Sequence, residues 1–380
     1  MRLALNIVHV VESLDVGGLE RVVLSLATWQ RAHGGASRII CLFHEGPLGA
    51  EARASGIRVD VVNKAPGLDL RALRVLRRLL LEENVDILHT HNPVAHYYAA
   101  GAAAATGIGR IVNTRHGMGS SHESRQLRLL YRAALTDTAK VVAVCRAARD
   151  RFVEAGTVPA DKAAVIANGI AIDFIVARNT AAKDRLLSLL KRPRSAFLIG
   201  TVGRLNAVKS HQTLLHAIQR LRGAGRSVDL LVVGDGETRA ALEAEVSRLQ
   251  LRGCVHFLGM RPDVAELLPA LDVFALPSLS EGYSLALVEA ATAALPIVAT
   301  KVGGNGEIVD HGVTGLLVSP GDADEMAGAI AQLIDDPERR DRMGRAGRAW
   351  ALKAGSIDAM GRAYESLYRG GQGTFTRVDP

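Results

Sequence analysis

Apolar β-strand patterns alternate with segments of helical periodicity through both halves of this 380-residue chain. Such alternation predicts parallel sheets whose strands are joined by crossover helices. The expected strands of the first half lie near residues 3–11, 38–43, 58–62, 86–89, 110–114, 140–144 and 163–166. Those of the second half lie near residues 196–202, 228–233, 254–258, 271–276, 296–299 and 315–318. We therefore expect an α/β protein with two Rossmann-like, doubly wound domains, because a chain of this length exceeds what one core usually fills.

The expected domains are residues 1–170 and 171–355. The segment from Asp173 to Pro193 has no strand character and contains a polar helical pattern, so it is the best candidate for a linker. A helix is expected at 356–369. The Gly-rich, polar residues 370–380 that follow it are expected to be disordered.

Composition excludes several classes of protein. A chain with 48% hydrophobic and 22% charged residues is globular. Its three cysteines, Cys41, Cys145 and Cys254, have neither disulfide nor zinc spacing and fit a reducing cytosol. No apolar run approaches the roughly 20 residues of a membrane-spanning helix. The start, Met1 to Val11, has the pattern of a strand and not of a signal peptide. We therefore expect a cytoplasmic protein.

The positive charge is concentrated in the first half. Residues 1–170 hold 21 Lys+Arg against 15 Asp+Glu, whereas the whole chain has a net charge of +7. A basic half indicates an anionic partner. Nucleic acid is a poor candidate, because aromatic residues make up only 4% of the chain and no basic, aromatic binding motif is present. The segment from Leu70 to Leu80 predicts an amphipathic helix with four arginines. It is either a solvated basic face or a contact with an anionic membrane.

Two acids, Glu281 and Glu289, stand eight positions apart around the expected start of a helix at Ser284. The free N–H groups and the dipole of a helix N-terminus favour an anion. Acids on both sides of an anion site match a sugar–diphosphate–ribose molecule, with one carboxylate for the hydroxyls at each end. The alternative is a surface acid in a loop and a second acid that the helix dipole favours.

Two other loops that follow expected strands have residues suited to phosphate. Arg204 and Lys209 can converge on a diphosphate, the first as a fork of donors and the second as a point charge, or they are solvated loop cations. Gly17 and Gly18 precede a helix and can let the backbone approach a ligand. The G-x-G-x-x-G pattern is absent there, which argues against a dinucleotide cofactor.

Histidines and aspartates form further candidate sites. His116 follows an expected strand in a Gly-containing loop, where it either binds a sugar hydroxyl, transfers a proton or has no role. His89 and His91 share one face of a strand, but as a zinc pair they lack an obvious third ligand. Asp322-Ala323-Asp324 has the letters of a metal-binding D-x-D. However, Glu325 follows, and this spacing favours helix capping.

Taken together, these motifs resemble the retaining glycosyltransferases of the GT-B fold, family 4 (glycosyl transferases group 1). The resemblance covers nearly the whole chain. It rests on the motifs Gly17-Gly18, His116, Asn168-Gly169-Ile170, Gly203 to Lys209, Val233 to Gly236, Phe257 to Gly259, Glu281 to Glu289 and Gly303 to Ile308. It implies two Rossmann-like domains facing a cleft, the first binding the acceptor and the second a nucleotide-sugar donor. It also implies that helix 356–369 packs back on the first domain.

The resemblance further implies roles for individual residues. Arg204, Lys209 and the amides near Ser284 and Leu285 would hold the donor diphosphate. Glu281 and His116 would lie at the transferred sugar, Glu289 at the ribose, and Gly17 and Gly18 at the phosphate side of the cleft. Neither a divalent metal nor another cofactor is expected. Tyr283-Ser284 stands where Phe and then Gly or Pro are frequent, which leaves the identity of the sugar open.

The expected function is transfer of a hexosyl group from a UDP- or GDP-sugar to a lipid-linked or polysaccharide acceptor, with the anomeric configuration retained. Same-face attack is favoured over double displacement through Glu281. Two alternatives stay open: a nucleotide-sugar epimerase or hydrolase of the same fold, and a non-catalytic subunit that binds a nucleotide-sugar. The expected location is the cytoplasm, with peripheral contact at the inner face of the membrane.

Overall fold

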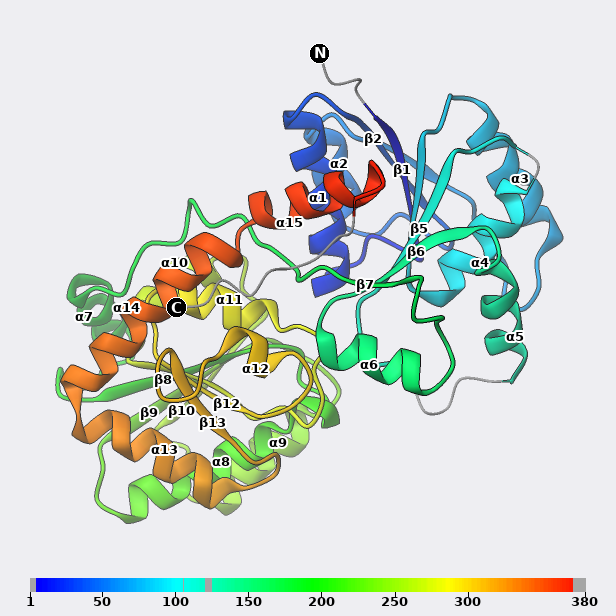
Figure 1. The fold of residues 1–380 in the computed structure, drawn as a ribbon. Coiled ribbons are helices and arrows are strands. Elements are labelled where there is room, and N and C mark those ends of the chain that lie inside the picture. The colour runs from blue at the N-terminus through cyan, green and yellow to red at the C-terminus, as the bar shows by residue number, and fades with distance from the viewer. Residues whose placement is uncertain (1–4, 105, 120–124, 372–380) are drawn as a thin grey trace. The chain divides into compact units, whose positions relative to one another are not determined.

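A computed structural model describes residues 5–104, 106–119 and 125–371. The described chain divides into two compact units (Figure 1). The first unit contains the described residues up to Ile170 together with those from Ile357 onward, and the second contains Ala171–Ser356. The sequence-based boundaries were 170/171 and 355/356. The tail expected at 370–380 lies, from residue 372 on, outside the described residues.

The first unit is built on a seven-stranded sheet in which every strand pairs in parallel with its neighbours. The strand order is β3-β2-β1-β4-β5-β6-β7. The strands are β1 Asn6–Val11, β2 Ala36–Cys41, β3 Arg58–Val61, β4 Ile87–His91, β5 Arg110–Arg115, β6 Thr138–Ala143 and β7 Ala163–Val165. The order reverses between β1 and β4. In doubly wound sheets this switch point is where ligands bind, beyond the carboxyl ends of the strands.

The described helices of the first unit are α1 Gly18–Ala32, α2 Leu48–Ala54, α3 Leu70–Leu81, α4 Asn92–Ala103, α5 Arg125–Ala134, α6 Arg146–Glu154 and α15 Ile357–Tyr368. The last of these, α15, packs beside α1 although the two stand at opposite ends of the sequence (Figure 1). Trp29 of α1 donates from Nε1 to Asp358 at 2.5 Å. A Cβ at Gly361 would lie 2.3 Å from the Trp29 ring. Glycine at this position therefore lets the two helices meet closely.

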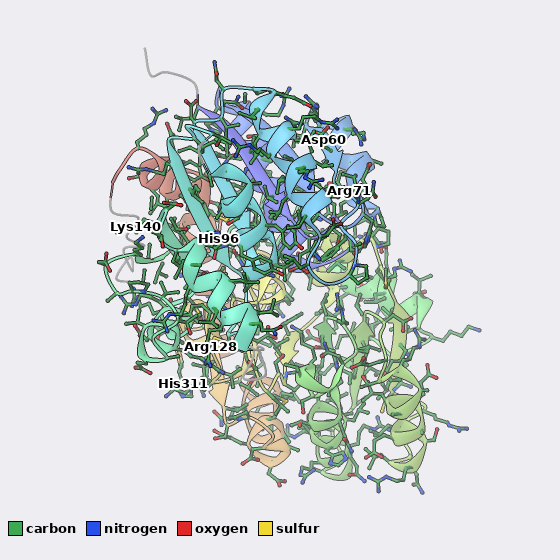
Figure 2. All side chains as sticks on the ribbon, turned by 90° about the vertical axis from the view of Figure 1, so that its right-hand side faces the viewer. Asp60, Arg71, His96, Arg128, Lys140 and His311 are labelled. Atoms are coloured by element: carbon green, nitrogen blue, oxygen red, sulfur yellow. The ribbon has the colours of Figure 1, made fainter. Side chains whose placement is uncertain are left out.

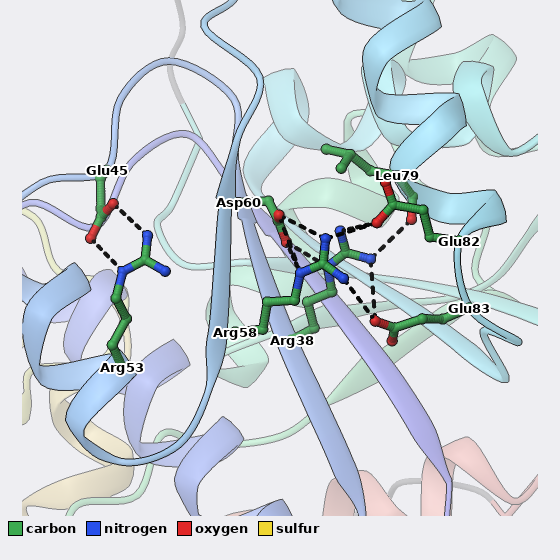
Figure 3. A network of polar contacts seen from close by, with 8 residues as sticks. All are labelled: Arg38, Glu45, Arg53, Arg58, Asp60, Leu79, Glu82 and Glu83. Atoms are coloured by element: carbon green, nitrogen blue, oxygen red, sulfur yellow. Dashed lines mark hydrogen bonds and ion pairs between the residues drawn. The ribbon is translucent and has the colours of Figure 1, made fainter.

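A buried arginine connects the edge of this sheet to α3 through ion pairs and a hydrogen bond (Figure 3). The side chain of Arg38 on β2 is 3% exposed and pairs with Asp60 of β3 at 2.6 Å. It also pairs with Glu82 at the end of α3 at 3.2 Å and donates to the carbonyl oxygen of Leu79 at 3.0 Å. A buried charge is tolerated only when it is paired and hydrogen-bonded. Removing one of these acids should therefore loosen the sheet edge.

The second unit contains a six-stranded parallel sheet with the order β10-β9-β8-β11-β12-β13. Its strands are β8 Phe197–Val202, β9 Val228–Val233, β10 Val255–Gly259, β11 Val273–Leu276, β12 Ile297–Thr300 and β13 Gly315–Val318. Its helices are α7 Thr180–Leu189, α8 His211–Gly223, α9 Arg239–Arg248, α10 Val264–Leu267, α11 Leu285–Thr292, α12 Asn305–Ile308, α13 Ala323–Asp335 and α14 Pro337–Ala354, with 3-10 turns η1 Ala207–Lys209 and η2 Leu268–Ala270.

A hydrophobic core lies between this second sheet and helices α8 and α13. Leu214 and Ile218 of α8, Leu230 of β9 and Met326 of α13 are fully buried. Each such side chain contributes roughly 1.5–3 kcal/mol by leaving water. This packing holds the strands in register, so the loops at their carboxyl ends have fixed positions.

The segment predicted to be a linker instead belongs to the second unit. The side chain of Asn179 caps α7 by accepting from the backbone N–H of Ala182, and the backbone N–H of Asn179 donates to the carbonyl oxygen of Pro269 at 3.0 Å. Lys183 of α7 pairs with Asp272 at 2.6 Å. The linker interpretation of residues 173–193 is therefore wrong from Asn179 to Leu189. The sequence shows a polar, amphipathic helix but not the buried aspartate that pairs with it.

Candidate active site

The strand order of the second unit reverses between β8 and β11, so the loops after these two strands meet at one edge of the sheet. The loop after β8 contains Arg204 and Lys209, and the loop after β11 leads through Glu281 into α11. A hydrogen bond from the amide of Leu279 to the carbonyl of Val208, at 2.8 Å, joins the two loops. Residues from two separate stretches of sequence therefore form one candidate site.

The loop after β8 rests on the loop after β9. The amide of Gly203 donates to Val233 at 3.0 Å. Gly234 has φ +132° and comes so close that a Cβ there would lie 2.0 Å from the carbonyl oxygen of Gly203. Any side chain at this position would push the β8 loop away, so glycine is required.

Lys209 and Glu281 are in direct contact. Nζ of Lys209 lies 2.6 Å from Oε1 of Glu281, and the two side chains are 23% and 9% exposed. Asn206 caps the short turn η1: its side-chain oxygen accepts from the backbone N–H of Lys209 at 3.1 Å. This hydrogen bond fixes the backbone position from which the lysine side chain extends. The sequence predicted a phosphate role for the lysine and a sugar role for the acid. The structure adds that each is the other's partner.

A serine that the sequence analysis did not single out completes this contact. Ser278, which is fully buried, donates from its hydroxyl to the same Oε1 of Glu281 at 2.6 Å. Its own carbonyl oxygen accepts from the hydroxyl of Thr300 at 2.6 Å. Pro277 and Ser278 directly follow β11 in the sequence. A Pro-Ser pair in this position indicates a turn but not the direction of the serine hydroxyl.

Helix α11 begins beside this pair. Ser284 is its N-cap residue, with extended backbone, and Leu285 is its first helical residue. The first amides of a helix have no partner inside the helix and can bind an anion. Gly304 donates to Gly282 at 3.0 Å, so the Gly303-Gly304 loop holds the turn that precedes the helix. Glu289, which is partly exposed, lies within the same helix.

Arg204 extends into solvent from the same loop as Lys209. Its side chain is exposed and makes no hydrogen bond or ion pair with any other residue in the described ranges. A guanidinium is always charged and offers a fork of donors that suits phosphate. Unlike Lys209, Arg204 is therefore not engaged by a neighbouring acid.

At the switch point of the first unit, Gly17 is the N-cap residue of α1 and Gly18 is its first residue. A Cβ at Gly17 would lie 2.3 Å from a carboxylate oxygen of Glu20, so glycine leaves room for that side chain. The glycine pair thus lies where the sequence predicted, at the start of a helix after β1. The helix start also has an acid in its first turn.

Four histidines share one face of the first sheet. His9 of β1 is in register with His89 of β4, His91 follows two residues later on the same face, and His116 comes directly after β5. One ring nitrogen from each of His9, His89 and His91 can be chosen so that the three atoms lie within 4.8 Å of one another. The pair at 89 and 91 therefore has a third histidine beside it, which was not obvious from the sequence. Strand pairing brings His9 there from a distant part of the sequence.

The ring nitrogens of these three histidines already have hydrogen-bond partners. Nδ1 and Nε2 of His9 lie 3.1 Å from His91 and 2.9 Å from Gln30. Those of His89 lie 2.7 Å from Tyr368 and 2.7 Å from Thr114. Binding a metal would have to break these contacts. Hydrogen bonding is thus the simpler account of the cluster.

Asp322 has the structural role that its spacing predicted. Its Oδ1 accepts from the amide of Glu325 at 2.8 Å, and Glu325 accepts from the amide of Ser319 at 2.7 Å. Asp324 pairs with Arg220. The helix-capping interpretation of this D-x-D sequence is confirmed.

Two doubly wound parallel-sheet units, with a cation, an acid and a helix N-terminus gathered at a switch point, define a protein of the GT-B type. The sequence model of the family "Glycosyl transferases group 1" matches residues 187–350, and that of "Glycosyltransferase Family 4" matches residues 16–174. The chain belongs to the group 1 glycosyltransferases and is a glycosyltransferase enzyme.

Named relatives and solved structures agree with this membership. The UDP-Gal:alpha-D-GlcNAc-diphosphoundecaprenol alpha-1,3-galactosyltransferase of Escherichia coli is 30% identical over 70% of this chain and 71% of its own length. The N-acetyl-alpha-D-glucosaminyl L-malate synthase of Bacillus anthracis is 29% identical over 80% of this chain and 79% of its own. The structure of Anabaena Alr3699/HepE in complex with UDP-glucose aligns with a TM-score of 0.85 and 25% identity, covering 96% of this chain and 99% of that one.

Proposed function

We propose that this enzyme transfers a hexosyl group from a UDP- or GDP-sugar to a lipid-linked or polysaccharide acceptor, with the anomeric configuration retained. The contact between Lys209 and Glu281 at the start of α11 carries this proposal. A cation and a carboxylate held together can serve the two halves of one donor, since the ammonium attracts diphosphate and the carboxylate accepts sugar hydroxyls. Glu289, farther along α11, binds the ribose in this arrangement.

In the proposed reaction the bond between the anomeric carbon and the diphosphate oxygen breaks. The acceptor oxygen then bonds to the same face of that carbon, and the departing phosphate takes the acceptor's proton. Arg204, Lys209 and the amides of Ser284 and Leu285 stabilise the negative charge that develops on the diphosphate. Because these groups offset that charge, the proposal includes no divalent metal and no other cofactor.

The remaining predicted residues belong to the first unit. Gly17 and Gly18 are proposed to approach a phosphate group through their backbone, and His116 to hydrogen-bond a sugar hydroxyl. UDP is favoured over GDP as the donor base, because the names of the Escherichia coli relative and the Anabaena complex both contain UDP. The diphosphoundecaprenol in the former name supports a lipid-linked acceptor.

Two basic helices support a peripheral membrane contact. Arg71, Arg74 and Arg78 of α3 are exposed, while Arg77 is partly covered and donates to the carbonyl of Ala104 at 2.5 Å.

Helix α5 adds Arg128 and Arg132 next to Leu129 and Leu130, which are 67% and 43% exposed. Arg71 and Arg128 mark the two helices in Figure 2. Exposed leucines among arginines are typical of helices that lie on anionic membranes. No helix in the described ranges is both long and apolar enough to cross a bilayer.

A donor panel followed by a transfer assay tests the proposal. Thermal shifts with UDP, GDP, ADP and their sugars would identify the base, and a UDP-sugar should give the largest shift. Transfer to a GlcNAc-diphosphopolyprenol acceptor, with NMR analysis of the product, would give the anomeric configuration. Donor consumption without acceptor would favour the epimerase or hydrolase alternative. Donor binding with no turnover of any acceptor would favour the binding subunit, and an inverted product would contradict retention.

A further inference from the structure

A chain of hydrogen bonds runs through the buried histidines of the first unit and ends at His116. It begins at Gln30 of α1, whose Oε1 lies 2.9 Å from Nε2 of His9. Nδ1 of His9 lies 3.1 Å from Nε2 of His91, and Nδ1 of His91 lies 2.9 Å from Nε2 of His116. His9 and His91 are 0% and 1% exposed. His9 and His91 therefore each use one ring nitrogen in a hydrogen bond toward α1 and the other in a hydrogen bond toward the loop after β5.

These imidazoles are neutral at physiological pH. Burial lowers the pKa of His9 to about 4 and that of His116 to about 3, and burial also lowers the pKa of His91 well below its usual value. A neutral imidazole has one N–H donor and one acceptor nitrogen. Once the direction of one hydrogen bond in the chain is set, every other direction follows.

Gln30 sets that direction. Its Oε1 can only accept, and Ser37 also donates to it at 2.7 Å, while its Nε2 faces the hydroxyl of Tyr368 at 3.5 Å. His9 must therefore donate from Nε2 and accept at Nδ1. His91 then donates from Nε2 to His9 and accepts at Nδ1, so the proton of His116 lies on Nε2.

With the proton of His116 on Nε2, its Nδ1 carries a lone pair that no donor among the described residues meets. This atom is buried and has no hydrogen-bond partner in the described part of the chain. Buried polar atoms without partners are rare in native proteins and each calls for an explanation. The loop itself is held in place, because the amide of His116 donates at 3.2 Å to the side chain of Asn92, a residue with φ +65°. The lone pair therefore has a fixed position.

We propose that His9 and His91 are positioning residues that hold His116 as its Nε2–H tautomer, so that its Nδ1 accepts a hydrogen bond from a substrate hydroxyl. The part of this inference that names a substrate hydroxyl rests on the proposed function. The tautomer follows from contacts inside the first unit. In functional histidines generally, a hydrogen bond at one ring nitrogen decides which of the two nitrogens carries the proton.

The tautomer can be measured directly on the full-length protein without substrate. Two-bond ¹H–¹⁵N correlation spectra of histidine-labelled protein distinguish a protonated from an unprotonated ring nitrogen. We expect Nδ1 of His116 to be unprotonated and Nε2 protonated at neutral pH. A protonated Nδ1 at His116 would overturn the proposal, whatever the activity of the enzyme. Zinc bound in a 1:1 ratio in the purified protein, with loss of the N–H signals of His91, would also overturn it.

Two substitutions at His91 separate positioning from packing. His91→Asn puts an amide oxygen near the position of Nδ1 and can still accept from His116, whereas His91→Leu cannot. We expect His91→Leu to lower kcat about tenfold, as for loss of one hydrogen bond, with donor KM little changed and mixed tautomers at His116. His91→Asn should restore most of kcat and the single tautomer.

Tyr364→Phe is the matched control, because it removes a buried hydroxyl that lies 2.9 Å from Thr114 but leaves the Gln30–His9–His91–His116 chain intact. Equal losses of kcat in His91→Leu, His91→Asn and Tyr364→Phe would show a packing role only and contradict the proposal. If no donor and acceptor support transfer in the wild type, the proposed function fails while the spectrum still decides the tautomer.

Discussion

Nζ of Lys209 lies 2.6 Å from Oε1 of Glu281, and the hydroxyl of Ser278 lies 2.6 Å from the same oxygen. This arrangement fixes the lysine and the acid relative to each other before any donor binds. A diphosphate that approaches Lys209 would therefore place its sugar near Glu281. In the proposed function the pair would give the site a direction, with the diphosphate at Lys209 and the sugar at Glu281.

Removing the charge of Glu281 should lower turnover. Glu281→Gln keeps the size of the side chain but loses the carboxylate, and we expect kcat to fall by roughly 10²-fold or more if that charge supports the transition state. Glu289→Gln should act mainly on donor KM, because ribose contacts are similar in the ground and transition states. Steady-state kinetics of the two variants test this. Control of kcat by Glu289 and of KM by Glu281 would mean that the donor binds in the opposite direction.

Removing either predicted diphosphate contact should weaken use of the donor. For Arg204→Ala and Lys209→Ala we expect kcat/KM to fall by an amount equivalent to about 2–4 kcal/mol. Arg222→Ala is a suitable control, since this exposed arginine lies in the last turn of α8, away from the β8 loop. An unchanged kcat/KM in folded Arg204→Ala and Lys209→Ala would exclude both side chains from the donor site.

Chelation of divalent metals should leave the activity intact. Two basic side chains and a helix N-terminus neutralise the diphosphate in the proposed site, and Asp322 and Asp324 are engaged in helix capping and an ion pair. Initial rates before and after EDTA treatment and dialysis measure this directly. Loss of activity that magnesium or manganese restores would contradict the proposal.

The protein should lose stability in mild acid. Burial lowers the pKa of His9 to about 4 and that of His96, labelled in Figure 2, to about 3. Below pH 6.5 the unfolded state binds more protons than the folded state, so the free energy of unfolding falls as the pH drops toward about 4. For His9 alone, the lowered pKa corresponds to a loss of about 3 kcal/mol in the free energy of unfolding. Urea unfolding at pH 7, 6, 5 and 4.5 measures this.

A variant at His96 tests the origin of that acid sensitivity. Nδ1 and Nε2 of His96 lie 2.9 Å and 3.1 Å from the hydroxyls of Thr90 and Thr138, outside the chain that ends at His116. His96→Gln should make the stability less dependent on pH between 6.5 and 4.5. The same slope in variant and wild type would show that other groups cause the acid sensitivity.

Binding to anionic vesicles should depend on α3 and on salt. Each arginine near an anionic surface contributes about 1 kcal/mol, and salt screens this attraction over about 8–10 Å. Replacing Arg71, Arg74, Arg77 and Arg78 by Ser should reduce co-sedimentation with phosphatidylserine vesicles and leave donor affinity unchanged. The matched control replaces four exposed arginines of the second unit, Arg222, Arg248, Arg252 and Arg342. Absence of wild-type binding at low salt would make α3 a solvated face.

The sequence by itself determined the α/β class and the position of nearly every strand. Apolar runs near 196–202 and 228–233 correspond to β8 Phe197–Val202 and β9 Val228–Val233. The helix expected from Leu70 begins at that residue, and the helix expected at Ser284 begins one residue later, at Leu285. Both followed from local signals, because hydrophobic spacing acts within a few neighbouring residues. The chemical types at the candidate site were visible for the same reason: two cations and one acid in loops after strands, and a second acid in the helix that follows.

Only the tertiary structure decided which of these residues meet. The Lys209–Glu281 contact joins residues 72 positions apart, and the His9–His91 contact joins residues 82 positions apart. Both depend on the strand order, which puts β8 beside β11 and β1 beside β4. Strand pairing and its register are set by the packing of the whole sheet, whereas a periodic pattern reports only the local burial of one segment. For this reason Ser278 as a partner of Glu281, and His9 as the third histidine, became apparent only from the folded chain.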